Sequence, residues 1–325
     1  MNQGVHGYDA LLVVSFGGPE GKDDVIPFLE NVLRGRNVPR ERMLQVAQHY
    51  AQFGGVSPIN QQNRELITAL EKELEQNGPR LPIYWGNRNW HPMLADTIRQ
   101  MAADGIRNAL AFVTSAYSSY SSCRQYLQNI SDARDVVGPT APRVEKLRAF
   151  YNHPLFIEAN IDHIRAAWSQ IKDPKLAHLD FTAHSIPESM AANCDYAGQL
   201  AQTGSVIAHA LNIDNWERVY QSRSGSPSQP WLGPDVCDHL KTLRGEGVTE
   251  VVLAPIGFVS DHMEVVYDLD IEAQKVSNEI GLKMVRAKTA GTRPSFVRMI
   301  RELMLERIND VVPKNICAPD CCRII

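Results

Sequence analysis

The chain has 325 residues, 44% of them hydrophobic, so it can bury sizeable cores, and its formal net charge of −4 argues against a nucleic-acid partner. Charged residues make up 22% of the chain, which excludes a disordered polyelectrolyte. The first residues lack the pattern of a secretory signal, and the apolar runs fall far short of the roughly 18 residues that suggest a membrane-spanning helix. We therefore expect a cytoplasmic protein without a transmembrane segment.

Apolar, strand-like runs alternate with helical patterns along the whole chain. The predicted strands are "ALLVVSF" (10–16), "LPIYWGN" (81–87), "NALAFVTSA" (108–116), "AHLDFTAHS" (177–185), "WERVYQS" (216–222), "EVVLAPIGF" (250–258) and "GLKMVRA" (281–287). The predicted helices cover 23–35, 92–105, a segment from about Tyr120, a segment around Leu200, 234–247, a segment from about Asp261, and 294–310. The strands read as continuously apolar, which is typical of buried parallel strands.

This alternation predicts an α/β fold of two Rossmann-like halves, each a parallel sheet flanked by helices. We place the first half at residues 1–150 and the second at 151–312, followed by a cysteine-containing tail at 313–325. The turns "VVSFGGPE" and "DFTAHSIPE" both end in Pro-Glu, which suggests a duplication. In such sheets, ligands bind beyond the carboxyl ends of the strands.

His184 follows the run "DFTA" directly, at one of these strand ends. It is either a histidine packed at a domain edge, or a base or metal ligand, because imidazole changes charge near neutral pH and is the commonest metal ligand. The chain has no GxxxxGK[ST] phosphate loop, so the sequence does not support direct ATP hydrolysis.

Glu264, Asp268 and Glu272 follow another strand end at spacings of i, i+4 and i+8. On a helix this spacing stacks three carboxylates along one face, where each pair repels by roughly 0.2–0.5 kcal/mol. The acids either form a solvated face or take up protons and handle a metal weakly, because neighbouring carboxylates raise one another's pKa. Ser260 is the expected N-cap of this helix, and Asp261 suits its first turn.

Two loops rich in glycine and proline follow other strand ends. In "GGVSPIN" (54–60), Ser57 either caps a helix that begins near Pro58 or serves a site. In "SRSGSPSQPWLGP" (222–234), Trp231 either packs its own loop or lines a flat apolar pocket.

Taken together and in order, these segments resemble the ferrochelatase family over nearly the whole chain. The segments that carry the resemblance are "LRGR", "GGVSPIN", "GNRNW", "SAYSSYSSCRQY", "TAHSIP", "YQSRSGSPSQPWLGP" and "PIGFVSDHMEVVYDLDIE". The resemblance implies a porphyrin cleft between the two halves, and insertion of ferrous iron into a porphyrin with loss of two pyrrole protons.

The resemblance also implies roles for individual residues. His184 and Glu264 would act at the Fe²⁺ ion as the catalytic pair, one as base and the other as metal ligand, in either assignment. Asp268 and Glu272 would form an acidic row that relays protons or iron. The residues matched to substrate binding are Phe16, Arg34, His49, Tyr50, Ser57, Tyr126 and Trp231.

The segments "GNRNW" and "SSCRQY" resemble the branch of the family that acts on coproporphyrin III. A protoporphyrin IX ferrochelatase, a chelatase for another tetrapyrrole and a non-catalytic porphyrin or haem carrier are the alternatives. Phe16 stands where some coproporphyrin enzymes have a tyrosine that binds the product iron, and Leu33 stands where many relatives have arginine. Propionate binding is therefore expected from Arg34, Arg36 or His49. Neighbouring enzymes of the haem pathway are expected partners.

Three of the six cysteines lie in the last nine residues. Some ferrochelatases hold a [2Fe–2S] cluster with three cysteines of a C-terminal extension and one from the body of the protein. By this resemblance the ligands are Cys123, Cys317, Cys321 and Cys322. A structural zinc site and a reactive tail without metal are the alternatives. Cys194 and Cys237 are expected to be buried in helices.

Overall fold

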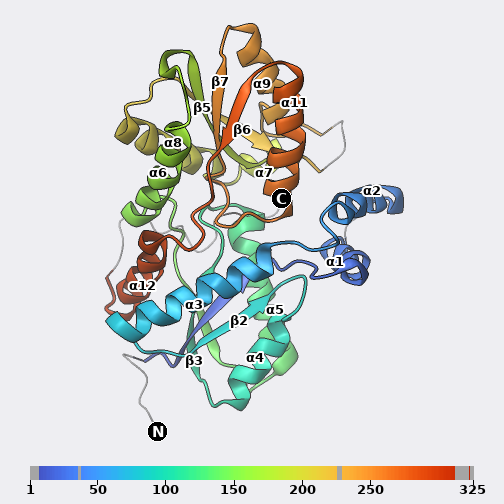
Figure 1. The fold of residues 1–325 in the computed structure, drawn as a ribbon. Helices are drawn as coiled ribbons and strands as arrows, with labels where there is room; N and C mark the ends of the chain where they lie inside the picture. Colours follow the sequence, from blue (N-terminus) through green and yellow to red (C-terminus); the bar gives the residue numbers. More distant parts are fainter. Residues whose placement is uncertain (1–6, 36–37, 225–228, 312–321, 323–325) are drawn as a thin grey trace. The chain divides into compact units, whose positions relative to one another are not determined.

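The computed structural model describes residues 7–35, 38–224, 229–311 and 322 (Figure 1). These residues form two compact units that are discontinuous in sequence. Of the described residues, the first unit contains 7–114, 125–148 and 300–311, and the second contains 115–124, 149–299 and Cys322. The division of the chain at residues 150 and 312 stays a prediction.

The first unit contains a sheet of four parallel strands in the order β2-β1-β3-β4. These strands are β1 (Ala10–Ser15), β2 (Ile83–Asn87), β3 (Asn108–Val113) and β4 (Arg143–Lys146). All six residues of β1 are buried, because β1 lies inside the sheet and both of its faces are covered. In register, Leu11 lies beside Ile83 of β2 and Leu110 of β3.

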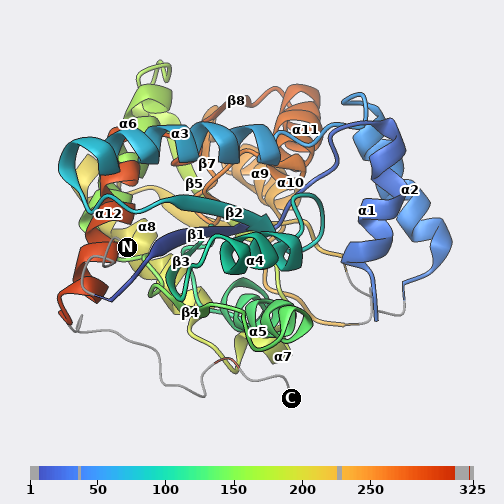
Figure 2. The same cartoon turned by 90° about the horizontal axis from the view of Figure 1, so that it is seen from below.

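Helices cover both faces of the first sheet. The covering helices are α3 (Ile59–Asn77), α4 (Leu94–Ala103) and α5 (Gln125–Val137), whereas α1 (Val25–Val32) and α2 (Arg40–Ala51), which follow a 3-10 turn at Lys22–Asp24, lie together beside the sheet (Figure 2). The apolar side chains of α4 and α5 pack against Leu12 and Val14 of β1. The helix α3 lies on the other side of this sheet from α4 (Figure 2). The last helix, α12 (Pro294–Ile308), begins in the second unit and continues into the first.

The second unit repeats the same sheet order, as β6-β5-β7-β8, and all its strands are parallel. These strands are β5 (Ala177–His184), β6 (Trp216–Gln221), β7 (Glu250–Ala254) and β8 (Lys283–Arg286). Its helices are a π-helix at Tyr120–Arg124, α6 (Pro154–Trp168), a 3-10 turn at Pro174–Leu176, α7 (Glu188–Ala191), α8 (Tyr196–Leu211), α9 (Val236–Gly245), α10 (Met263–Val265), a π-helix at Val266–Ala273, and α11 (Gln274–Glu279). The two parallel sheets confirm the predicted α/β fold.

The strand β5 is not the continuously apolar run that the sequence analysis expected. Leu179 and Phe181 face α8, where Gly204 leaves room for the ring of Phe181. His178, Asp180 and Thr182 alternate with them and therefore lie on the opposite face. That face is covered by α9 (Figure 1).

Two serines considered as N-caps do not cap a helix. Ser260 is not an N-cap, because a turn in which His262 N donates to Ser260 O delays the helix, and His262 caps α10 instead. Ser57 does not cap α3, whose N-cap is Pro58 without a side-chain hydrogen bond. Among the described residues, none of the helices combines the length and the apolar character required to cross a membrane.

Candidate functional site

His184 is the last residue of β5, and several hydrogen bonds fix its position. Its Nδ1 donates to Ser185 O, which leaves Nε2 with a lone pair when the ring is neutral. Tyr196 Oη donates to His184 O at 3.0 Å, and Ser185 N donates to Gln221 O at 2.8 Å. The ring is therefore held in one tautomer, with Nε2 available for chemistry.

Glu264 lies in α10, and both of its backbone polar groups are bonded to side chains. Its N–H donates to His262 Nδ1 at 3.1 Å, and its carbonyl accepts from Gln221 Nε2 at 2.6 Å. The buried Gln221 in turn accepts from Thr182 Oγ1 at 2.8 Å. These bonds hold the start of α10 against β5 and β6, so they fix the backbone position from which the Glu264 side chain extends.

Gly257 permits the loop after β7 to reach the end of β5. Its N–H donates to Thr182 O at 3.0 Å. A Cβ atom on Gly257 would lie 2.5 Å from Ala183 Cβ and 2.6 Å from Ala183 Cα, closer than packed atoms allow. Because part of this contact is with backbone, only glycine fits without movement of the loop.

His184 and Glu264 face each other across this junction, with Nε2 and Oε1 3.6 Å apart. Burial opposes the charge of His184, but Glu264 and a backbone acceptor outweigh it and raise the pKa of His184 to about 8. Burial likewise opposes the charge of Glu264, but His184 lowers the pKa of Glu264 to about 2. At neutral pH the two side chains therefore form an ion pair.

His262 lies on the other side of Glu264, with Nε2 4.0 Å from Oε2. Its ring packs edge-on against Phe258 at a centroid distance of 4.8 Å. Burial lowers the pKa of His262, although Glu264 partly opposes this effect. The neutral His262 therefore positions Glu264 without competing with His184 for the proton.

Asp268 and Glu272 lie in the π-helix Val266–Ala273, which continues from α10. Ser222, whose φ of 62° is left-handed, donates its hydroxyl to Asp268 Oδ2. Burial, with the charges of Glu264 and Glu272, raises the pKa of Asp268 to about 7. Asp268 can therefore accept or release a proton near neutral pH, whereas Glu272 is exposed to solvent.

The other two acids of this segment have a structural partner. Arg286 of β8 pairs with both oxygens of Asp270, at 2.5 and 2.9 Å, and with Asp261 Oδ1 at 2.9 Å. Burial acts against the charge of Arg286, but the two carboxylates raise its pKa. Asp261 and Asp270 therefore hold β8 to the segment around α10, and the acidic row consists of Glu264, Asp268 and Glu272.

Trp231 lies beside the loop that follows His184. It forms an antiparallel bridge with Pro187, and the next residue, Leu232, donates to Ile186 O at 3.0 Å. Ser185 Oγ donates to Leu232 O at 2.7 Å. The segment around Trp231 is thus joined to the loop that carries His184, within the second unit.

The remaining predicted substrate residues all lie in the first unit. The rings of Phe16 and Tyr50 both pack edge-on against the ring of Phe28. The guanidinium carbon of Arg88 lies 5.5 Å from the ring centroid of Phe16 and 4.8 Å from that of Tyr126.

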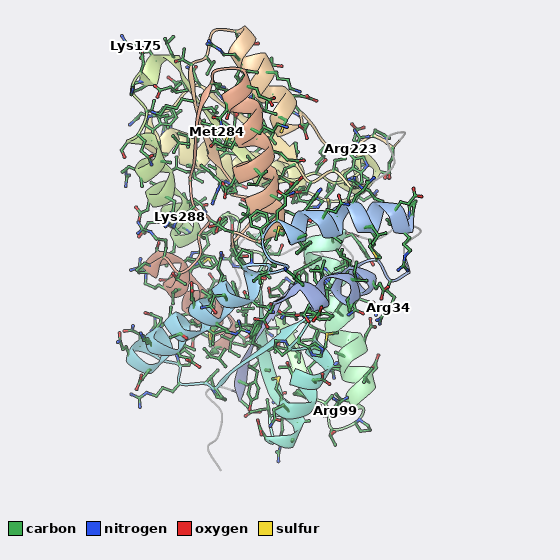
Figure 3. All side chains as sticks on the ribbon, turned by 45° about the vertical axis from the view of Figure 1, so that its right-hand side comes forward. Arg34, Arg99, Lys175, Arg223, Met284 and Lys288 are labelled. Carbon is green, nitrogen blue, oxygen red and sulfur yellow. The ribbon has the colours of Figure 1, made fainter. Side chains whose placement is uncertain are left out.

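The polar members of the first-unit set are Ser57, His49 and Arg34. Ser57 is buried, and burial together with Arg42 lowers the pKa of His49. The exposed Arg34, at the end of α1, donates to Asn31 Oδ1 (Figure 3). Arg36 lies outside the described residues.

Among the described cysteines, Cys322 is buried and interacts with the thiol of Cys194. Cys194 and Cys237 are only half-buried, contrary to expectation. Cys194 Sγ lies 3.3 Å from Met190 O, and Ser121 of the π-helix that carries Cys123 lies 3.8 Å from Met190 Sδ. The interaction with Cys322 lowers the pKa of Cys194 to about 7. Cys317 and Cys321 lie outside the described residues.

Sequence reasoning missed Gln221, Ser222, Gly257 and Cys194. Ser222 and Gly257 occur in the segments at the predicted strand ends, but their partners only become apparent when β5, β6 and the loop after β7 are adjacent. The assembled site offers one imidazole nitrogen, one ionised carboxylate and one carboxyl that titrates near neutral pH. Such a set can bind a divalent cation weakly and accept protons.

Comparison with known proteins agrees with this chemistry. The model of the ferrochelatase family matches residues 8–308. A ferrochelatase of Rhodopirellula baltica is 55% identical over 327 residues, covering 97% of this chain and 93% of that protein. A coproporphyrin III ferrochelatase of Nocardia farcinica is 48% identical over 338 residues, covering 97% of this chain and 96% of that protein.

Solved structures share the fold at low identity. The sirohydrochlorin chelatase SirB of Bacillus subtilis subspecies spizizenii, in complex with cobalt, superposes with a TM-score of 0.54 at 9% identity, covering 94% of this chain and 97% of that chain. SirB from Bacillus subtilis with Fe³⁺ gives a TM-score of 0.55 at 10% identity, with coverages of 93% and 98%.

Proposed function

Because the chain belongs to the ferrochelatase family, we propose that it inserts ferrous iron into a porphyrin, and that the porphyrin is coproporphyrin III. The observation that carries this proposal is the pair His184–Glu264, with Nε2 and Oε1 3.6 Å apart at the end of β5. A porphyrin carrier would need no such pair. The product would enter haem biosynthesis.

Insertion replaces two pyrrole protons by one Fe²⁺ ion, so the site must accept two protons for each ion it delivers. In the first version, Glu264 guides the iron and His184 Nε2 takes a pyrrole proton. His184 must first lose its own proton, and a dication near Glu264 favours this loss because like charges repel. Asp268, with a pKa of about 7, can take the next proton and pass it toward the exposed Glu272.

In the second version, Glu264 is the base and His184 is the metal ligand. Both versions use a donor set that is weaker than a closed four-ligand site, so the ion can be surrendered to the four porphyrin nitrogens. Trp231 and the substrate residues of the first unit (Phe16, Arg34, His49, Tyr50, Ser57 and Tyr126) are proposed to bind the porphyrin. Phe16 has no donor atom, so it cannot bind the product iron.

The decisive experiment supplies ferrous iron without air to the full-length protein, separately with coproporphyrin III and with protoporphyrin IX. Metal insertion is followed by absorbance. We expect turnover with coproporphyrin III at the higher kcat/KM. A higher kcat/KM with protoporphyrin IX would refute the substrate assignment, and stoichiometric binding without turnover would refute the enzyme in favour of the carrier.

We also propose that the tail cysteines hold a [2Fe–2S] cluster, with Cys123, Cys317, Cys321 and Cys322 as ligands. Cys194 interacts with Cys322, and both Cys194 and Ser121, two residues before Cys123, contact Met190, which supports this proposal. This arrangement also makes Cys194 an alternative to Cys123 as the ligand from the body of the protein.

The cluster is tested by absorption and by iron and sulfide analysis of protein purified without air. Cys123→Ser is expected to lose the cluster and Cys237→Ser to keep it. Loss in Cys194→Ser with retention in Cys123→Ser would reassign the ligand. Zinc in place of iron and sulfide would refute the cluster.

We propose a cytoplasmic location, because ferrous iron and thiols both persist in a reducing compartment. Contact with the preceding and following enzymes of haem biosynthesis remains a prediction.

A further inference from the structure

A second cluster of metal-binding side chains lies at the other end of β5. His178 and Asp180 extend from the same face of β5, and His239 extends from α9, which covers that face. Asp180 Oδ1 lies 2.8 Å from His178 Nδ1 and 3.2 Å from His239 Nε2. All three ligating atoms lie within 4.8 Å of one another. Two imidazole nitrogens thus converge on one carboxylate oxygen.

Apolar side chains of β7 and α9 lie next to this cluster. Val251 and Leu253 of β7 lie beside His178 and Asp180 in register, and Leu240 of α9 packs on the same core. Asp180 is fully buried. Burying a carboxylate among such side chains is strongly unfavourable unless charge and hydrogen bonds offset it. A core position of this kind would ordinarily hold an aliphatic residue.

The second carboxylate oxygen of Asp180 also points to a bound cation. Oδ2 is buried and has no hydrogen-bond partner among the described residues. If the cluster were only a hydrogen-bonded network, this oxygen would remain unsatisfied, and leaving a buried charged group unsatisfied costs more than leaving a neutral one. A cation bound beside the carboxylate would satisfy both oxygens, because carboxylates bind metals in monodentate and bidentate modes.

We propose that His178 Nδ1, His239 Nε2 and Asp180 form a binding site for a divalent transition-metal ion, of the class of Zn²⁺, Fe²⁺ and Co²⁺. Two imidazoles and one carboxylate are a donor set that this class prefers, with the remaining coordination positions filled by water. The side chains of the two histidines are 14% and 12% exposed, so an ion can enter from solvent. Glu217, the register partner of Asp180 on β6, and Glu246 add negative charge near His239.

This site is distinct from the pair His184–Glu264. His178 and His184 are six residues apart on one strand, which corresponds to about 20 Å. Lys175, which precedes β5, and Arg223, which follows β6, lie toward opposite ends of the second unit in Figure 3 and mark the two ends of this sheet. No described residue of the cluster at the start of β5 takes part in the proposed iron insertion.

The test counts metal ions bound by the full-length protein after treatment with a chelator. Co²⁺ is titrated by calorimetry and by its visible absorption into wild type, His178→Ala, His239→Ala and Asp180→Asn. His209→Ala, at an exposed position of α8, is the matched control. His184→Ala separates the proposed insertion site from the new one. All variants share the same cysteines, so binding to thiols cancels in the comparison.

We expect His178→Ala and His239→Ala each to lose one bound Co²⁺, or to bind it at least about 100-fold more weakly. His184→Ala and His209→Ala should keep that ion, which also separates failure of this proposal from failure of the proposed function. Equal numbers and affinities of Co²⁺ in wild type and in both histidine variants would overturn the proposal.

A second measurement does not depend on the folding of variants. Crystals of wild type are soaked in Zn²⁺, and anomalous scattering at the zinc edge locates the bound ions. An ion between His178, Asp180 and His239 is expected. At saturating Zn²⁺, the same three side chains hydrogen-bonded without an ion would refute the site.

Discussion

The strands β1 and β5 hold the same position in sheets of the same order, yet their side chains differ in kind. β1 is buried throughout, and five of its six residues are aliphatic. β5 is buried nearly as well but places His178, Asp180, Thr182 and His184 along one face. The order of strands in a sheet therefore does not by itself determine the chemistry at the sheet. In the second unit, the polar side chains lie on one face of β5, and each of them requires a partner from another element.

The largest expected effect comes from the polar end of β5. His184→Ala should reduce the rate of iron insertion by about 10²–10⁴-fold, because the site loses either its base or its metal ligand. The matched change at the end of β1 is Ser15→Ala, which removes the acceptor of Asn63 Nδ2. It should cost about 1 kcal/mol of stability and leave the rate close to wild type. Normal insertion of both iron and zinc by His184→Ala would rule out both versions of the mechanism.

The next variant tests whether the rate depends on the position of the loop after β7 as well as on the residue types in the site. In Gly257→Ala, the new methyl group would meet Ala183, so the loop carrying Glu264 must move. Displacement of about 1 Å can cost 10²-fold in rate. We expect kcat to fall by roughly 10- to 100-fold, whereas Gly245→Ala, where a Cβ meets nothing within 4 Å, should leave kcat unchanged. Equal rates in the two variants would show that the close approach is dispensable.

A smaller effect concerns the pH profile. The pKa of His184 is raised to about 8, chiefly by Glu264 against the opposing effect of burial. If neutral His184 is the active form, kcat/KM rises with pH through this pKa. Glu264→Gln removes the carboxylate charge, so the rising limb should move to lower pH by about one unit or more, in the residual activity of the variant. If the rising limb of the pH profile stayed in place in Glu264→Gln, the titrating group would not be His184.

The smallest effect is on stability. The pKa of Asp268 is raised from 3.8 to about 7, mainly by burial, so the folded state holds this proton more tightly than the unfolded state. Stability is therefore lost as pH rises from about 4 to about 7. Asp268→Asn cannot ionise, so its Tm relative to wild type should increase across this window. A constant difference in Tm between the two proteins would contradict the raised pKa.

Much of the fold could be predicted from the sequence because its strands are short, strongly apolar runs between helical patterns. The exit of β5 was also predictable, because His184 follows a buried run directly and a parallel sheet brings such ends to one edge. The helix start at His262 was not predictable. Ser260 is the better N-cap by residue type, and the turn between Ser260 and His262 that displaces it depends on the path of the loop after Gly257.

The cluster of His178, Asp180 and His239 could not be predicted from the sequence either. Nothing in the local sequence brings α9 over the start of β5, because that contact depends on the strand order β6-β5-β7. The same holds for Ser222 and Asp268, which come together only when the end of β6 meets the helical segment after β7. Such long-range pairs depend on tertiary structure, whereas sequence patterns report local structure.

The π-helix Val266–Ala273 makes the acidic row sensitive to the number of residues in the chain as well as to their type. A π-turn closes its hydrogen bond one residue later than an α-turn, so the segment accommodates one additional residue. Removing a single residue from it would let the ordinary helix resume, and each residue of an α-helix turns the chain by about 100°. If the residue removed lies between Glu264 and Asp268, then Asp268 and Glu272 would turn about the helix axis relative to Glu264, although every acid was still present. For this segment, a one-residue deletion is a more severe change than most substitutions.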